Sequence, residues 1–160
     1  MNDDARFEDG GERPLSLAAE GPEDLEVISA LLQDAVGQTS DIAWMPKRRR
    51  LALLLNRFRW EDKRAAERRS RPYERVRTML VFDDVKRVRS QGVDPREKDV
   101  VLSVLALQFA PAEDGAGQLS LILAGDGEIA AEVECLNVRL RDVTRPYRAP
   151  SGHVPGHDAD

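Results

Sequence analysis

The fold of this 160-residue chain is decided by residues 119–133, which read LSLILAGDGEIAAEV. Two apolar, strand-like runs at 119–123 and 128–133 flank the Gly-Asp-Gly sequence at 125–127. An Asp-Gly pair between such runs is typical of a type I′ turn, in which both central residues need a positive φ. The stretch therefore predicts an antiparallel β-hairpin.

Further strand patterns extend from this hairpin towards the N-terminus. The strongest is Val100–Phe109, where ten mostly apolar residues precede a Gly-containing loop. Shorter patterns occur at residues 15–17, 42–45, 51–60, 75–82 and 85–89. Because these strands follow one another without intervening helices, they indicate an antiparallel sheet rather than βαβ units.

A helix is expected at each end of this run of strands. The sequence Gly-Pro-Glu-Asp at 21–24 starts the first, since Pro suits the first helical position and carboxylates oppose the positive end of the helix dipole. Apolar residues at helical spacing continue it over 22–36, and those over 136–143 predict a short closing helix. The expected fold is a single α+β domain, an antiparallel β-rich sandwich or partly open barrel, with pleckstrin-homology-like architecture as the best match.

Length and composition predict one domain with two tails. Residues 1–13 are acidic and almost without large apolar side chains, so we expect them to be disordered. The α+β domain is expected over 14–143. Residues 144–160, rich in Pro, Gly and His, are expected to form a disordered tail.

The composition also predicts where the protein works. Charged residues make up 33% of the chain, and no apolar run approaches the roughly 20 residues of a membrane span. Residues 1–11 lack the basic and apolar regions of a secretory signal. The single cysteine, Cys135, cannot form an internal disulfide. The expected location is the cytoplasm, with no membrane partner.

Several stretches across the chain carry a family resemblance. They are EDLEVISA (23–30), LQDAV (32–36), LLLNRF (53–58), WE (60–61), VRS (88–90), GVD (92–94), KDVVLS (98–103) and EVEC (132–135). In these stretches the chain resembles a bacterial family of small proteins with a domain of unknown function, over roughly residues 15–143. The resemblance implies one intact domain and assigns no catalytic, cofactor or binding residue.

Positive charge is concentrated in residues 47–89, where 16 Lys and Arg stand against 6 Asp and Glu, although the net charge of the chain is −5. Cations neutralise phosphates and aromatic rings stack on unpaired bases, so the Arg-rich segment 47–77 suggests a nucleic-acid-binding module. No zinc-finger or helix-turn-helix spacing accompanies it. A solvated basic face, paired with acidic residues of this chain or of a second copy, explains the same segment.

The aromatic residues beside this segment allow two interpretations. Trp44, Phe58 and Trp60 lie near strand ends, where aromatic side chains usually pack the core. Flanked by Arg57 and Arg59, the same three residues would form an apolar pocket with a cationic rim for an acidic small molecule or peptide. These five residues are the candidate binding surface.

Signatures of catalysis and of cofactors are weak. His153 and His157 lie in the Pro- and Gly-rich tail, and no His lies in the folded region to activate Cys135. Asp83 and Asp84 lie beside a turn signal, where Asp commonly satisfies backbone N–H groups. We expect no catalytic residue, no cofactor and no metal ion.

The sequence thus favours a small protein-binding or accessory module without catalytic activity that works through a protein partner or self-association. A nucleic-acid-binding module using residues 47–77 is the first alternative. A small-molecule sensor or enzyme with a pocket near Trp44, Phe58 and Trp60 is the second.

Overall fold

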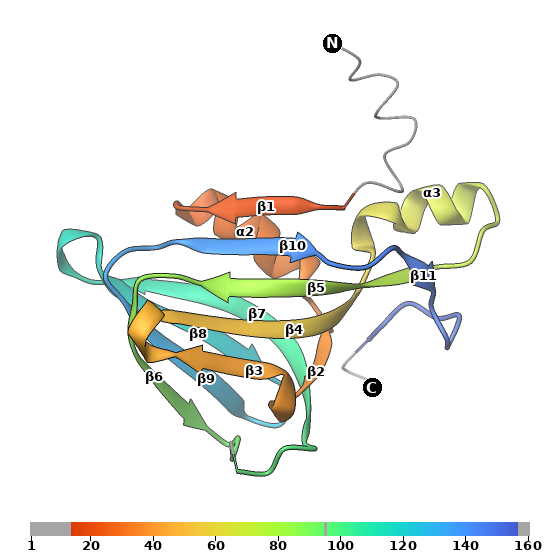
Figure 1. Ribbon diagram of the computed structural model, residues 1–160. Coiled ribbons are helices and arrows are strands. Elements are labelled where there is room, and N and C mark those ends of the chain that lie inside the picture. The colour runs from red at the N-terminus through yellow and green to blue at the C-terminus, as the bar shows by residue number, and fades with distance from the viewer. Residues whose placement is uncertain (1–13, 95, 157–160) are drawn as a thin grey trace.

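The computed structural model describes residues 14–94 and 96–156, which form one strongly curved sheet with a helix packed along it (Figure 1). The strands are β1 (Ser16–Ala19), β2 (Val36–Gln38), β3 (Ile42–Met45), β4 (Arg50–Phe58), β5 (Glu74–Phe82), β6 (Val85–Gln91), β7 (Val101–Pro111), β8 (Gly117–Leu123), β9 (Gly127–Val133), β10 (Val138–Asp142) and β11 (Tyr147–Arg148). The helices are α2 (Pro22–Leu31) and α3 (Lys63–Arg68). The connections between elements contain the 3-10 turns η2 (Thr39–Asp41), η3 (Pro46–Arg48), η4 (Trp60–Asp62) and η5 (Glu113–Gly115).

The strand order explains why the sheet is curved. The order is β1-β10-β5-β4-β2-β7-β8-β9-β6, with all pairs antiparallel. Strands β5 and β6 are far apart in this order, yet only Asp83 and Asp84 separate them in the sequence. Two residues bridge only about 10 Å, so the sheet must bend back on itself. The β-rich, antiparallel α+β prediction is confirmed. The described strands form a single open sheet, neither the two sheets of the predicted sandwich nor a closed barrel.

The predicted hairpin is present as β8 and β9. Its register pairs Leu123 with Gly127, and positive φ values occur at Gly125 (79°) and Asp126 (65°). The turn therefore lies one residue earlier than the Asp-Gly pair that the sequence indicated. Gly127 already belongs to β9, where an added Cβ would contact Leu123 and Val93.

Helix α2 packs on β7 and supplies part of the core. Pro22 lies at its N-terminus and Leu25 and Ile28 face inward, 4% and 0% exposed. The predicted helix extended to residue 36, whereas α2 ends at Leu31. The reason is that β7 takes over the backbone bonding: the N–H of Asp34 donates to the carbonyl of Val104 at 2.8 Å, and the N–H of Val104 donates back to Ala35 at 2.8 Å.

The predicted closing helix over 136–143 is wrong, because this segment contains strand β10. Burial alternates along it, with Val138, Leu140 and Asp142 inside and two arginines outside, and β10 pairs with both β1 and β5. A four-residue apolar spacing fits a strand as well as a helix, since four is a multiple of the two-residue strand period. Backbone pairing with β1 on one side and β5 on the other makes this segment a strand.

The described chain continues in the sheet beyond the predicted domain boundary at residue 143. Tyr147 and Arg148 form β11 on β5, and Ala149 is 3% exposed, with its N–H donating to the carbonyl of Tyr73 at 2.8 Å. The predicted disordered tail of residues 144–160 thus differs from the structure at 147–149. Composition indicated disorder, but an available sheet edge pairs a short segment of almost any sequence. The predicted disorder of residues 1–13 lies outside the described residues.

Candidate functional site

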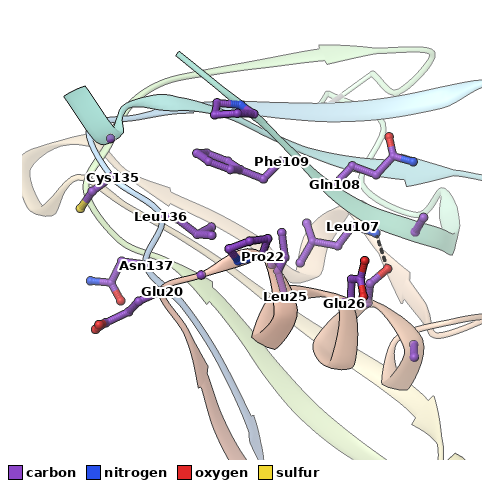
Figure 2. Close-up of a pocket in the computed structure, with 16 residues that line it drawn as sticks. Glu20, Pro22, Leu25, Glu26, Leu107, Gln108, Phe109, Cys135, Leu136 and Asn137 are labelled. Carbon is purple, nitrogen blue, oxygen red and sulfur yellow. Dashed lines mark hydrogen bonds between the residues drawn. The ribbon is translucent and has the colours of Figure 1, made fainter. Parts of the chain in front are cut away.

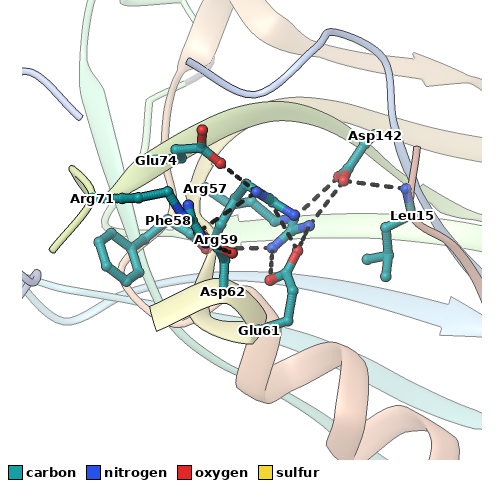
Figure 3. Close-up of polar contacts among 9 residues, drawn as sticks. All are labelled: Leu15, Arg57, Phe58, Arg59, Glu61, Asp62, Arg71, Glu74 and Asp142. Atoms are coloured by element: carbon teal, nitrogen blue, oxygen red, sulfur yellow. Dashed lines mark hydrogen bonds and ion pairs between the residues drawn. The ribbon is translucent and has the colours of Figure 1, made fainter. Parts of the chain in front are cut away.

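Arg57 lies near the end of β4 and is fully buried rather than part of an open surface. Its guanidinium donates to both oxygens of Asp142, at 3.1 and 2.9 Å, and to both oxygens of Glu61, at 2.8 Å each. Figure 3 shows the two carboxylates approaching this guanidinium from different sides. Burial by itself lowers the pKa of Arg57, but the hydrogen bonds that it donates to Glu61 and Asp142 outweigh burial and raise the pKa.

Arg59 is also paired inside the molecule, with 8% of its surface exposed. It forms an ion pair with Glu74 and lies 3.6 Å from Glu61 and 3.8 Å from Asp62. Asp62 in turn accepts hydrogen bonds from Arg71 at 3.0 and 3.1 Å (Figure 3). We call these seven side chains the arginine cluster: Arg57, Arg59, Arg71, Glu61, Asp62, Glu74 and Asp142. Three cations face four anions in it, so it presents no excess positive charge.

Of the three aromatic residues of the predicted pocket, the structure brings Phe58 and Trp60 together but not Trp44. Phe58 is fully buried and packs on Trp60, with ring centroids 4.7 Å apart, and Trp60 donates its indole N–H to the carbonyl of Gln33 at 3.0 Å. Trp44, on β3, pairs with Leu51 at the other end of β4. Leu51 and Phe58 are separated by seven strand residues, or roughly 20 Å. The candidate binding surface is therefore divided. Its residues 57–60 lie at and just after the end of β4, whereas Trp44 lies on β3, beside the start of β4.

The remaining basic residues of the segment 47–77 lie at separate places. Lys47 and Arg48 are exposed in η3, before β4, whereas Arg64 and Arg68 are exposed on α3, beyond the end of β4. Strand β4 has nine residues and spans roughly 30 Å. The positive charges that the sequence brings together are thus divided between the two ends of a strand and the arginine cluster.

The adjacent carboxylates Asp83 and Asp84 both have structural partners. Asp83 accepts from Arg50 and Arg139, each at 2.7 Å. Its burial raises its pKa, but these two arginines outweigh burial and hold the pKa below its ordinary value. Asp84 accepts from the thiol of Cys135 at 3.3 Å, and this contact raises the pKa of the thiol. A raised thiol pKa opposes a role as nucleophile.

An open groove of about 1180 Å³ lies between α2 and the second half of β7. Figure 2 shows Leu107 and Phe109 of β7 above the helix, with Leu136 at the far side. The apolar residues that line it are Pro22, Leu25, Ala30, Ala106, Leu107, Phe109, Pro111 and Leu136. We call this feature the α2–β7 groove.

The charged side chains that line the α2–β7 groove are all acidic. They are Glu20, directly after β1, and Glu26, on the exposed side of α2. Sequence reasoning missed this groove because its walls come from three segments far apart in the chain. The one available signal was the amphipathic helix followed, some 70 residues later, by an apolar strand that ends in Pro111.

Within 14–94 and 96–156, no three His, Cys, Asp or Glu side chains are grouped so that they could hold a metal ion. His157, the second histidine of the tail, lies outside this part of the chain. None of the described helices is long and apolar enough to cross a membrane.

The fold and the groove define a class of small β-rich domain, in which one curved open sheet carries a packed helix with an acidic-rimmed apolar groove beside it. The chain belongs to the family described as protein of unknown function DUF2948, which matches residues 15–157. The predicted resemblance to a domain-of-unknown-function family is confirmed. No curated protein and no solved structure matches the chain.

Proposed function

We propose that this protein is a binding module without catalytic activity that holds an apolar peptide segment of a protein partner in the α2–β7 groove. The single observation that carries the proposal is an apolar groove of peptide size whose charged lining is entirely acidic. The partner segment is therefore apolar in its centre and basic at its flanks. We place this role in the bacterial cytoplasm.

The apolar lining supports binding through burial of side chains. Ligand sites are typically concave and lined mostly by apolar and aromatic groups, with volumes of roughly 300–1000 Å³ for small molecules. The groove is slightly larger than that range and is open to solvent rather than enclosed, which suits a short chain segment better than an enclosed metabolite. Phe109 and Leu136 are among the apolar side chains that line it (Figure 2).

The charge of the rim supports a basic partner. Both Glu20 and Glu26 are exposed, so a segment bound in the groove can reach them. Complementary charges at the rim of an interface select partners and speed association more than they add affinity. An acidic peptide of the same apolar content would meet repulsion at both carboxylates.

The internal pairing of Arg57 and Arg59 supports a protein partner over a nucleic acid. A nucleic-acid surface needs cations that can reach phosphates, and these two arginines are held by carboxylates of their own chain. The pleckstrin-homology-like architecture stays a prediction, and the proposed binding role does not depend on it.

The experiment is fluorescence anisotropy with labelled eight-residue peptides. The first peptide has four alternating Val and Leu residues between two pairs of Lys, and the second replaces each Lys by Glu. A third keeps the Lys residues and has Gly and Ser in the centre. We expect binding of the first peptide only, and a reversed preference when the protein carries Glu20→Lys and Glu26→Lys.

The matched control is the double variant Glu97→Lys and Asp99→Lys. These two residues are also exposed but lie outside the groove. Because both double variants replace two acidic residues by Lys, they change the net charge by the same amount. The control variant should bind the Lys-flanked peptide as the unchanged protein does. Equal weakening by both double variants, or binding of the Gly and Ser peptide, would contradict the proposal.

A further inference from the structure

The floor of the α2–β7 groove contains part of a strand edge that is not covered by another strand. Strand β7 pairs with β8 on one side along most of its length, from Val104 to Pro111. On its other side it pairs with β2 only at Val101–Ser103. The strand is therefore a central strand at its beginning and an edge strand at its end.

Hydrogen bonds identify which backbone groups face the groove. The N–H of Leu107 donates to the hydroxyl of Ser29 on α2 at 2.9 Å (Figure 2). The backbone N–H of Leu107 therefore points away from β8 and towards α2. Successive residues of a strand direct their N–H and C=O groups to alternate sides. Phe109 therefore directs its N–H and C=O to the same side as Leu107, towards the groove.

No strand of the described chain pairs with this side of β7 beyond Ser103. Unpaired N–H and C=O groups on a strand edge are a template for another strand. An extended peptide that adds to such an edge gains affinity from the main chain and specificity from alternate side chains. The edge at Phe109 offers both, because Phe109 lines a groove whose other lining residues are mostly apolar.

We infer that the partner segment binds as an added β-strand on the edge of β7, with main-chain hydrogen bonds to Phe109. This inference rests on the proposed function and specifies the conformation of the bound segment. Side chains of the segment alternate between the apolar floor and solvent, and its basic flanks lie towards Glu20 and Glu26.

Pro111 limits what can pair with this edge. It lies on the same side of β7 as Leu107 and Phe109 and has no N–H to donate. Proline on an edge strand opposes extended edge-to-edge pairing. Leu107–Pro111 spans roughly 16 Å, which is enough for a segment of about five residues. The edge thus fits a short peptide better than the long strand of a second copy.

The test uses the Lys-flanked peptide in two N-methylated forms. One form carries N-methyl groups on the first and third central residues, the other on the second and fourth. In an added strand only one of these sets faces β7, so one form should bind about tenfold more weakly while the other binds nearly as the unmodified peptide does. Equal loss in both forms would indicate a bound helix, and no loss in either would indicate side-chain contacts alone. Both outcomes overturn the inference.

A pair of protein variants tests the same edge from the other side. Phe109→Pro removes the N–H that faces the groove and leaves the bonds of its neighbours to β8, whereas Phe109→Ala removes only the ring. We expect Phe109→Pro to bind about tenfold more weakly than Phe109→Ala. If Phe109→Pro fails to fold, the N-methylated peptides decide alone. A peptide that follows the Glu20 and Glu26 charges but tolerates both N-methylation patterns would leave the proposed function standing and overturn strand addition.

Discussion

The arginine cluster and the α2–β7 groove both combine charged with apolar side chains, but they differ in where their charges are neutralised. In the cluster, Arg57 and Arg59 have carboxylate partners within their own chain. In the groove, Glu20 and Glu26 are exposed at the rim of an apolar surface. The comparison teaches that charge density along a sequence does not indicate which charges are available for binding.

The same comparison separates stability from binding. A buried ion pair costs desolvation of both ions, and losing one partner leaves the other uncompensated. Exposed carboxylates contribute little to the free energy of unfolding. We therefore expect variants of the cluster to change stability and variants of the groove to change binding.

The largest effect is expected for Arg57→Met. This change leaves Asp142, which is 8% exposed, without its cation, so the free energy of unfolding should fall by about 3–5 kcal/mol. Urea denaturation measures the loss. The control Arg77→Met, at an exposed position of β5, should stay within about 0.5 kcal/mol of the unchanged protein. Similar midpoints for the two variants would show that Arg57 is not a stabilising residue.

A smaller effect, on binding alone, is expected for Glu20→Lys with Glu26→Lys. The Lys-flanked peptide should bind about tenfold more weakly, since both attractive charges become repulsive. The urea midpoint should hardly move, because both residues are exposed. A large fall in the urea midpoint of this double variant would show that the groove carboxylates also stabilise the fold. That result would contradict the separation of binding from stability.

A still smaller effect is expected for the pH dependence of the cluster. Burial raises the pKa of Glu61, but hydrogen bonds from Arg57 outweigh burial and hold the pKa below its ordinary 4.5. A carboxyl group whose pKa is lower in the folded state stabilises the fold above its unfolded value. That contribution is lost as the pH falls from about 4.5 through the lower folded pKa.

Glu61→Gln removes this contribution. With 30% of the Glu61 side chain exposed, it amounts to less than about 1 kcal/mol. Urea denaturation across pH 3–7 should show a flatter acid limb for Glu61→Gln than for the unchanged protein. The variant Glu97→Gln, at an exposed position, should keep the original profile. Identical profiles for all three proteins would contradict the assignment.

The smallest effect is expected for Arg64→Gln with Arg68→Gln on α3. Both side chains are exposed, so the urea midpoint and the affinity for the Lys-flanked peptide should both stay unchanged. The same variant tests the nucleic-acid hypothesis, with labelled single-stranded RNA titrated at low and high salt. Salt-sensitive RNA binding by the unchanged protein that this variant loses would favour the Arg-rich segment as the functional surface.

Local patterns predicted much of the sheet. The apolar runs at 42–45, 75–82 and 100–109 became β3, β5 and β7, and the hairpin at 119–133 became β8 and β9. These elements need only alternation and turn residues, which neighbours along the chain provide. The family, too, was recognisable from short stretches spread over the chain.

Other features depended on partners far away in the sequence. The segment 136–143 has an apolar spacing compatible with helix and strand, and pairing with β1 and β5 selected the strand. The predicted helix ended at Leu31 because β7 bonds to residues 34 and 35. Local propensity has no access to such bonds.

The sequence by itself thus determined the β-rich antiparallel class, the main strands and the family. Only the tertiary structure decided that Arg57 and Arg59 are internal and that α2 and β7 enclose a groove. The physical reason is distance along the chain. Arg57 meets Asp142 across 85 residues, and Ser29 meets Leu107 across 78. The burial and pairing of a charge depend on contacts of this range, whereas the period of a strand depends on its nearest neighbours.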